Sequence, residues 1–91
     1  MSYSEEELKQ IEQLASIYMT ISDIAVILDK NEELLRADIK RKNDPANIAY
    51  NRGKISSKIT LRKQEIQLAK VGSPLALDNV RKALMDMEDD E

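Results

Sequence analysis

Apolar residues recur along this chain at spacings of three and four, which is the pattern of amphipathic helices. A capping box formed by Ser4 and Glu7 begins the first such run, and we expect a helix from there to about Met19. Glycine and proline are few, and no alternating strand pattern is bounded by turn residues. The sequence therefore predicts an all-α fold.

Residues 20–42 predict two short helices joined by a tight turn. Thr20 with Asp23 caps the first helix in a capping-box-like arrangement, and Asn31 caps the second. This is the layout of a helix-turn-helix, whose second helix can enter a DNA groove. The positions expected to face inward are Ile24, Ala25, Leu28, Leu34, Leu35 and Ile39.

Two more helices are expected after residue 43. Asp44 as cap and Pro45 at the first helical position begin a long helix, which runs to about Lys70 and ends at Gly72. Ser73 with Pro74 then begins a last helix. Its apolar stripe consists of Leu77, Val80, Leu84 and Met87. The acidic tail from residue 86 onward is expected to fray.

The long helix carries two opposed apolar stripes at about 100° per residue. Two opposed stripes imply that both faces are covered, by a neighbouring subunit or by the rest of a monomeric bundle. We expect a homo-oligomer, with these stripes and part of the last helix at the subunit interface. The expected interface residues are Ile48, Ile55, Ile59 and Ile66 on one stripe, Tyr50, Leu61 and Leu68 on the other, and Leu77, Val80 and Leu84 on the last helix.

Composition limits the chemistry that this chain can perform. Cysteine and histidine are both absent, which removes thiolate metal ligands and the commonest general base. Arg52-Gly53-Lys54 lacks the leading glycine of a phosphate-binding loop, and the acidic tail lacks the glycine and closing glutamate of an EF-hand. We therefore expect no enzymatic activity, cofactor or metal site. Without a leader or a long apolar run, a cytoplasmic protein with no membrane partner is expected.

Charge is segregated along the chain. Residues 1–29 hold one basic and six acidic residues, residues 30–70 eleven basic and five acidic, and residues 71–91 two basic and six acidic. The middle segment can bind a polyanion although the whole chain carries a net charge of −3. A solvated, salt-bridged helical surface is the alternative. The candidate DNA-binding residues are Lys30, Arg36, Lys40, Arg41, Lys42, Arg52 and Lys54.

The order of these parts resembles the small terminase subunit of tailed bacteriophages, over residues 8 to 87. Three segments carry the resemblance: Ile-Ala-Val-Ile-Leu at residues 24–28, Tyr-Asn-Arg-Gly-Lys at residues 50–54, and Leu-Ala-Lys-Val-Gly-Ser-Pro-Leu-Ala at residues 68–76. The resemblance implies a helix-turn-helix DNA-binding domain at residues 1–43 and a helical hairpin for oligomerisation at residues 44–87. It also implies that the acidic tail, residues 88–91, contacts the large terminase subunit.

On this resemblance, the chain forms a ring, binds double-stranded viral DNA and regulates the large terminase during genome packaging, in the host cell cytoplasm. Two departures bear on the expectation. The usual glycine of the turn is replaced around Asp29 and Lys30, and Glu32 and Glu33 disfavour base reading by the second helix. A dimeric helix-turn-helix transcription regulator and a helical protein–protein adaptor remain alternatives.

Overall fold

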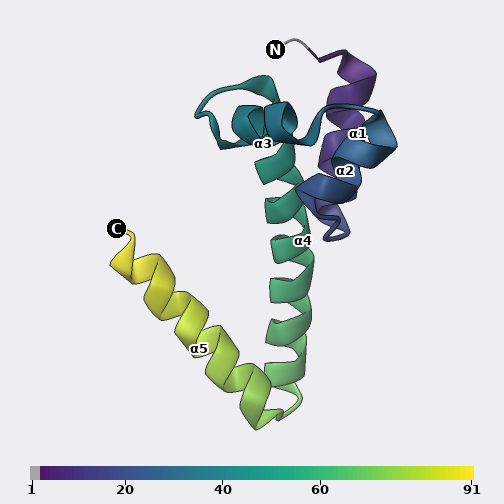
Figure 1. The fold of residues 1–91 in the computed structure, drawn as a ribbon. Coiled ribbons are helices and arrows are strands. Elements are labelled where there is room, and N and C mark those ends of the chain that lie inside the picture. Colours follow the sequence, from purple (N-terminus) through teal and green to yellow (C-terminus); the bar gives the residue numbers. More distant parts are fainter. Residues whose placement is uncertain (1–2) are drawn as a thin grey trace. The chain divides into compact units, whose positions relative to one another are not determined.

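The computed structural model describes residues 3–91, which form five helices (Figure 1). These are α1 (Glu5–Ser16), α2 (Ile21–Leu28), α3 (Glu32–Lys40), α4 (Pro45–Lys70) and α5 (Pro74–Asp89). No strand occurs within residues 3–91, and the all-α prediction is confirmed. The chain packs as two compact units, the first ending at Ser57 and the second beginning at Lys58, so α4 contributes to both.

The first two helices begin where their capping residues predict. The Ser4 hydroxyl accepts a hydrogen bond from the Glu7 amide at 3.1 Å, and the Glu7 carboxylate accepts one from the Ser4 amide at 2.9 Å. Thr20 and Asp23 repeat this exchange at 3.1 and 3.4 Å. Each capping box satisfies amides that would otherwise lack a partner at a helix start.

The other helix starts are set by single side chains, also as predicted. The Asn31 side-chain oxygen accepts from the Leu34 amide at 3.0 Å and begins α3. The Asp44 carboxylate accepts from the Ala46 amide at 2.9 Å ahead of α4. Ser73 accepts from the Ala76 amide at 3.3 Å and places Pro74 in the first turn of α5. Local sequence thus determines all five starts.

The helix ends depart from the predictions in two places. Helix α1 ends at Ser16, not near Met19, because Tyr18 turns into the left-handed region at φ 68° and the Met19 amide bonds back to the Leu14 carbonyl at 3.0 Å. The acidic tail expected to fray is helical as far as Asp89. The turn after α2 closes without glycine, since Asp29 itself adopts φ 54°.

The core of the first unit lies among α1, α2, α3 and the start of α4. Ile11, Ile24 and Leu35 are fully buried at its centre. The inward positions predicted on α2 and α3 are confirmed for Ile24, Ala25, Leu35 and Ile39, and Leu28 is partly buried against them. Leu34 is the exception: it is 51% exposed, because the buried face of α3 is formed by Leu35, Asp38 and Ile39.

A face of small residues joins α4 to α1. The buried residues of α4 are Ala46, Ala49, Gly53 and Ser57. A Cβ added at Gly53 would overlap the Glu12 carbonyl oxygen and lie 2.7 Å from the Ala15 Cβ. The backbones therefore approach closely at this glycine. Within the first unit α4 packs mainly through this face. Of the two apolar stripes predicted to be covered, Tyr50 also packs against the core and is half-buried.

The second unit contains the last turns of α4, a tight turn at Gly72, and α5, which runs back in the opposite direction. Its core is small: Ala76 is the one buried residue of α5. Large apolar side chains of this unit are instead exposed, namely Ile59, Leu61, Leu68, Val71, Leu75, Leu77, Leu84, Met85 and Met87. Taken alone, the second unit leaves these large apolar side chains exposed.

Candidate nucleic-acid interface

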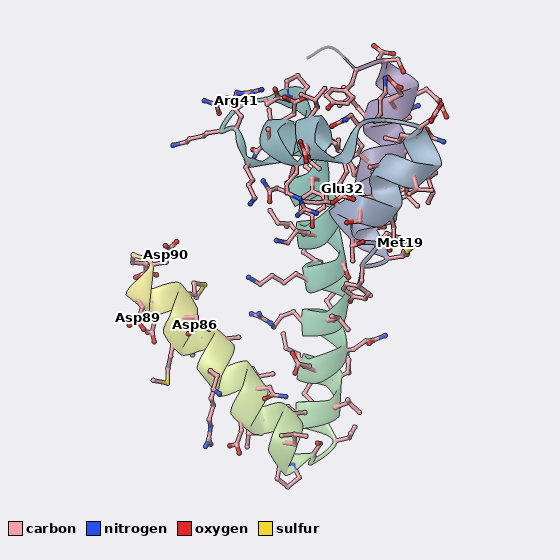
Figure 2. The ribbon with its side chains drawn as sticks, viewed as in Figure 1. Met19, Glu32, Arg41, Asp86, Asp89 and Asp90 are labelled. Atoms are coloured by element: carbon pink, nitrogen blue, oxygen red, sulfur yellow. The ribbon has the colours of Figure 1, made fainter. Side chains whose placement is uncertain are left out.

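Arg41, one of the predicted DNA-binding residues, is held by two carboxylates. It follows the last residue of α3 (Figure 2), and its guanidinium lies 2.7 Å from Asp38 Oδ1 and 3.0 Å from Asp44 Oδ2. The side chains of Asp38 and Asp44 are 5% and 8% exposed, so both acids need this cation. The hydrogen bond that Arg41 donates to Asp38 raises the pKa of Arg41 above its ordinary value. Arg41 therefore neutralises buried acids of its own chain.

Tyr3 completes this cluster from the N-terminal segment. Its hydroxyl donates to Asp38 Oδ2 at 2.6 Å. This hydrogen bond, with the one from Arg41, lowers the pKa of the Asp38 carboxyl despite its burial. Burial raises the pKa of Tyr3, and the hydrogen bond to Asp38 raises it further. The cluster fastens the segment ahead of α1 to the buried side of α3.

Lys30 and Arg36 are also engaged within the chain. The Lys30 ammonium lies 2.9 Å from Glu7 and 5.8 Å from the centre of the Tyr3 ring. It thereby ties the turn after α2 to the first turn of α1. Arg36 lies 3.2 Å from Glu32, one turn earlier on α3, and donates to the Ser22 hydroxyl at 3.3 Å. The Arg36–Glu32 pair is about half exposed, and pairs of this kind hold a cation only weakly.

Four predicted residues remain exposed and make no ion pair within residues 3–91: Lys40, Lys42, Arg52 and Lys54. Lys40 ends α3, and Lys42 follows in the loop before α4. Arg52 lies at a shallow α1–α4 groove whose rim also contains Glu5 and Glu12. The ammonium of Lys54 lies 5.6 Å from the centre of the Tyr50 ring, one turn earlier on α4. These cations are available to an anionic partner.

The exposed side of α3 is mixed in charge. Its first turn carries Glu32, which is labelled in Figure 2, and Glu33, both exposed. Its last turn carries Lys40. Carboxylates near base edges and phosphates meet mostly acceptors and negative charge. The geometry of α3 therefore suits contact with a sugar–phosphate backbone near its C-terminal end better than base reading at its start.

The predicted oligomer-interface residues are largely solvent-accessible in the single chain. Tyr50, Ile66 and Val80 are half-buried. The exposed ones are Ile48, Ile55, Ile59, Leu61, Leu68, Leu77 and Leu84, with exposures of 39–54%. Most residues of both α4 stripes are thus exposed, because the small-residue face makes the contact with α1.

Among residues 3–91, no cluster of acidic, histidine or cysteine side chains is placed to hold a metal ion. No helix in that range is both long enough and apolar enough to cross a bilayer. No family model, curated protein or solved structure matches the chain. A functional proposal for this chain therefore rests on its own residues.

Proposed function

We propose that this chain is an oligomeric DNA-binding protein of the small terminase type, which engages duplex DNA and regulates a large terminase during genome packaging. The observation that carries the DNA-binding part is the set of exposed cations without ion-pair partners, Lys40, Lys42, Arg52 and Lys54, on the first unit of a net-acidic chain. Exposed cations that have no ion-pair partner within the described chain are available to contact phosphates. The packaging role rests on the resemblance of residues 8–87.

Oligomerisation is proposed from the second unit. Residues 58–91 are fewer than the roughly 40 below which a unit needs disulfides, metals or oligomerisation to be stable. The chain has no cysteine, and α5 buries only Ala76. Other copies of the chain supply the missing apolar contacts, through Leu61 and Leu68 on α4 and Leu77 and Leu84 on α5.

In an oligomer, several copies of the same DNA contact compensate for the weakness of each single contact. The first turn of α3 is acidic, and two of the predicted cations, Lys30 and Arg41, are committed within the chain. Several such contacts presented by one assembly raise the effective concentration of each, so that modest single affinities give firm binding. We infer low sequence specificity with a strong dependence on salt.

The DNA-binding part is tested by a mobility shift with duplex DNA at two salt concentrations. Binding at low salt that weakens steeply at high salt is expected, since each phosphate contact releases counterions. Absence of binding at low salt would leave the protein–protein adaptor as the better reading. A strong preference for one palindromic site, bound by a dimer, would favour the transcription regulator.

The assembly is tested by the double variant Leu61→Lys, Leu68→Lys. Both side chains are about half exposed in the single chain, so charge at these positions is expected to dissociate subunits while helix content persists. Light scattering and circular dichroism measure the two effects. The matched control, Lys58→Ala with Lys63→Ala, changes two exposed residues of the same helix and is expected to leave the assembly intact. Global unfolding of the double variant would instead place the stripe in a monomer core.

A further inference from the structure

A groove in the first unit gathers side chains from all four of its helical segments. It is an open depression of about 580 Å³. Its lining comes from the end of α1, the start of α2, the middle of α3 and the first half of α4, and includes no acidic residue. The side chains that matter for binding are Tyr18, Thr20, Ser22, Arg36, Tyr50 and Lys54.

The two cations of the groove are positioned by their neighbours. Arg36 donates to the Ser22 hydroxyl at 3.3 Å, which holds its guanidinium at the groove beside the first turn of α2. The Lys54 ammonium sits 5.6 Å from the centre of the Tyr50 ring, an uncharged partner that leaves the charge unneutralised. Among residues 3–91, the acid that forms an ion pair with Arg36 is the exposed Glu32, at 3.2 Å. The groove thus combines two held cations with the aliphatic hydroxyls of Thr20 and Ser22 in a net-acidic chain.

Tyr18 at this groove adopts a conformation that a bulky residue rarely takes. Its φ of 68° lies in the left-handed region, where glycine is the usual residue at a helix end. The side chain is 66% exposed, so burial does not offset the strain. Tyr18 is therefore strained without compensation from burial. Backbone strain of this kind clusters at functional sites, and from it we infer a functional role for Tyr18.

We propose that this groove binds a phosphate of the nucleic-acid backbone. Arg36 and Lys54 contact the phosphate oxygens, the hydroxyls of Thr20 and Ser22 donate to them, and Tyr18 packs against the adjacent sugar. The inference rests on the proposed DNA-binding function and adds its principal phosphate contact, away from the Lys40 and Lys42 end of α3. A free phosphate ion presents the same chemistry, and the test separates the two sources.

The first test compares two charge-matched double variants of the full chain by fluorescence anisotropy with a labelled duplex at several salt concentrations. Arg36→Gln with Lys54→Gln is expected to weaken binding about tenfold or more and, since one phosphate contact is lost, to lower the log–log salt slope by about 1. The control, Lys70→Gln with Lys82→Gln, removes two exposed cations outside the groove and should bind within about twofold of the wild type.

The results of this comparison distinguish a failure of the groove assignment from a failure of the proposed DNA-binding function. If the wild type binds and the groove variant retains its affinity and salt slope, the groove assignment is overturned while DNA binding stands. If the wild type binds no duplex at the lowest salt, the proposed function itself fails. Binding of sodium phosphate, measured at matched ionic strength with no binding of duplex, would assign the groove to the free ion and overturn the backbone assignment.

A second variant tests Tyr18 by opposite effects on stability and binding. Tyr18→Gly relieves the left-handed strain, so the melting temperature is expected to rise, while DNA affinity falls about threefold with loss of the ring contact. Asn43→Gly is the matched control, because Asn43 has φ 69° and lies outside the groove lining. It should gain stability and keep its affinity. Unchanged affinity in Tyr18→Gly would remove Tyr18 from the site.

Discussion

The two units of this protein differ in how they satisfy their apolar residues. The first, ending at Ser57, surrounds Ile11, Ile24 and Leu35 so completely that each is fully buried. The second, beginning at Lys58, buries Ala76 on α5 and leaves residues such as Leu84 half exposed. The same helical composition thus yields a self-contained core in one place and an open apolar surface in the other.

The units differ in their charges as well. The four ion pairs among the described residues all lie in the first unit, where Arg41 alone serves two acids. The second unit ends in an acidic run that includes Asp86, Asp89 and Asp90 on and just beyond α5 (Figure 2). The first unit thus contains both a closed apolar core and these four ion pairs, whereas the second leaves its large apolar side chains exposed.

The largest expected effect comes from a matched pair of leucine truncations. Leu35→Ala removes a fully buried side chain and is expected to lower the free energy of unfolding by about 3 kcal/mol at any protein concentration. Leu84→Ala, on the exposed stripe of α5, acts only through assembly, so its effect on the urea midpoint should vanish on dilution. Urea unfolding followed by circular dichroism at several concentrations makes the comparison. A concentration-independent loss in both variants would contradict the contrast between the units.

The next effect concerns the Asp38 cluster of the first unit. Asp38→Asn removes a buried carboxylate that accepts from both Tyr3 and Arg41, and is expected to cost about 2 kcal/mol. Because the native pKa of Asp38 lies below its ordinary 3.8, its contribution is complete above that value and is lost as pH falls through the native pKa. Unfolding measured between pH 7 and pH 2 should show this loss in the wild type and a flatter profile in Asp38→Asn.

The control for this cluster is Asp86→Asn, which changes an exposed acid in the second unit. It should leave the stability of the first unit unchanged. Equal pH profiles for the wild type and Asp38→Asn would show that the cluster contributes nothing to folding.

The smallest of the three effects is expected at Gly53, where a change to alanine should lower the stability of the fold although the same change usually raises it in an exposed helix. Glycine to alanine in an exposed helix stabilises by about 1 kcal/mol. At Gly53 the added Cβ would meet the Glu12 carbonyl oxygen and the Ala15 Cβ, so Gly53→Ala is expected to destabilise the first unit by about 1 kcal/mol. Lys58→Ala places the same side chain at an exposed position of the same helix and should be near neutral. Thermal melts compare them, and a more stable Gly53→Ala would refute the close crossing.

The sequence predicted the helix starts well because each depends on a few adjacent residues. Ser4, Thr20, Asn31 and Ser73 all cap as their side chains suggest. The end of α1 was missed because a left-handed Tyr18 is an unusual way to close a helix. Tyrosine at position 18 is not a residue type that predicts a left-handed conformation at a helix end.

The packed face of α4 was missed for a different reason. Helical periodicity is judged from large apolar residues, and those of α4 form two stripes of which Tyr50 alone packs, half-buried, against the core of the first unit. The signal was present as small residues at spacings of three and four, at positions 46, 49, 53 and 57. Charge segregation likewise predicts the candidate cations as a group. The tertiary packing then distinguishes them: Arg41 pairs with Asp38 and Asp44, whereas Lys54 forms no ion pair with a carboxylate within residues 3–91.

The most direct test of this account is the mass of the wild-type protein in solution, measured by multi-angle light scattering over a range of micromolar concentrations. If the open apolar surface of residues 58–91 is completed by other copies, the mass should correspond to a closed assembly larger than a dimer. A monomer at every concentration, with α5 still fully helical by circular dichroism and hydrogen exchange, would contradict it.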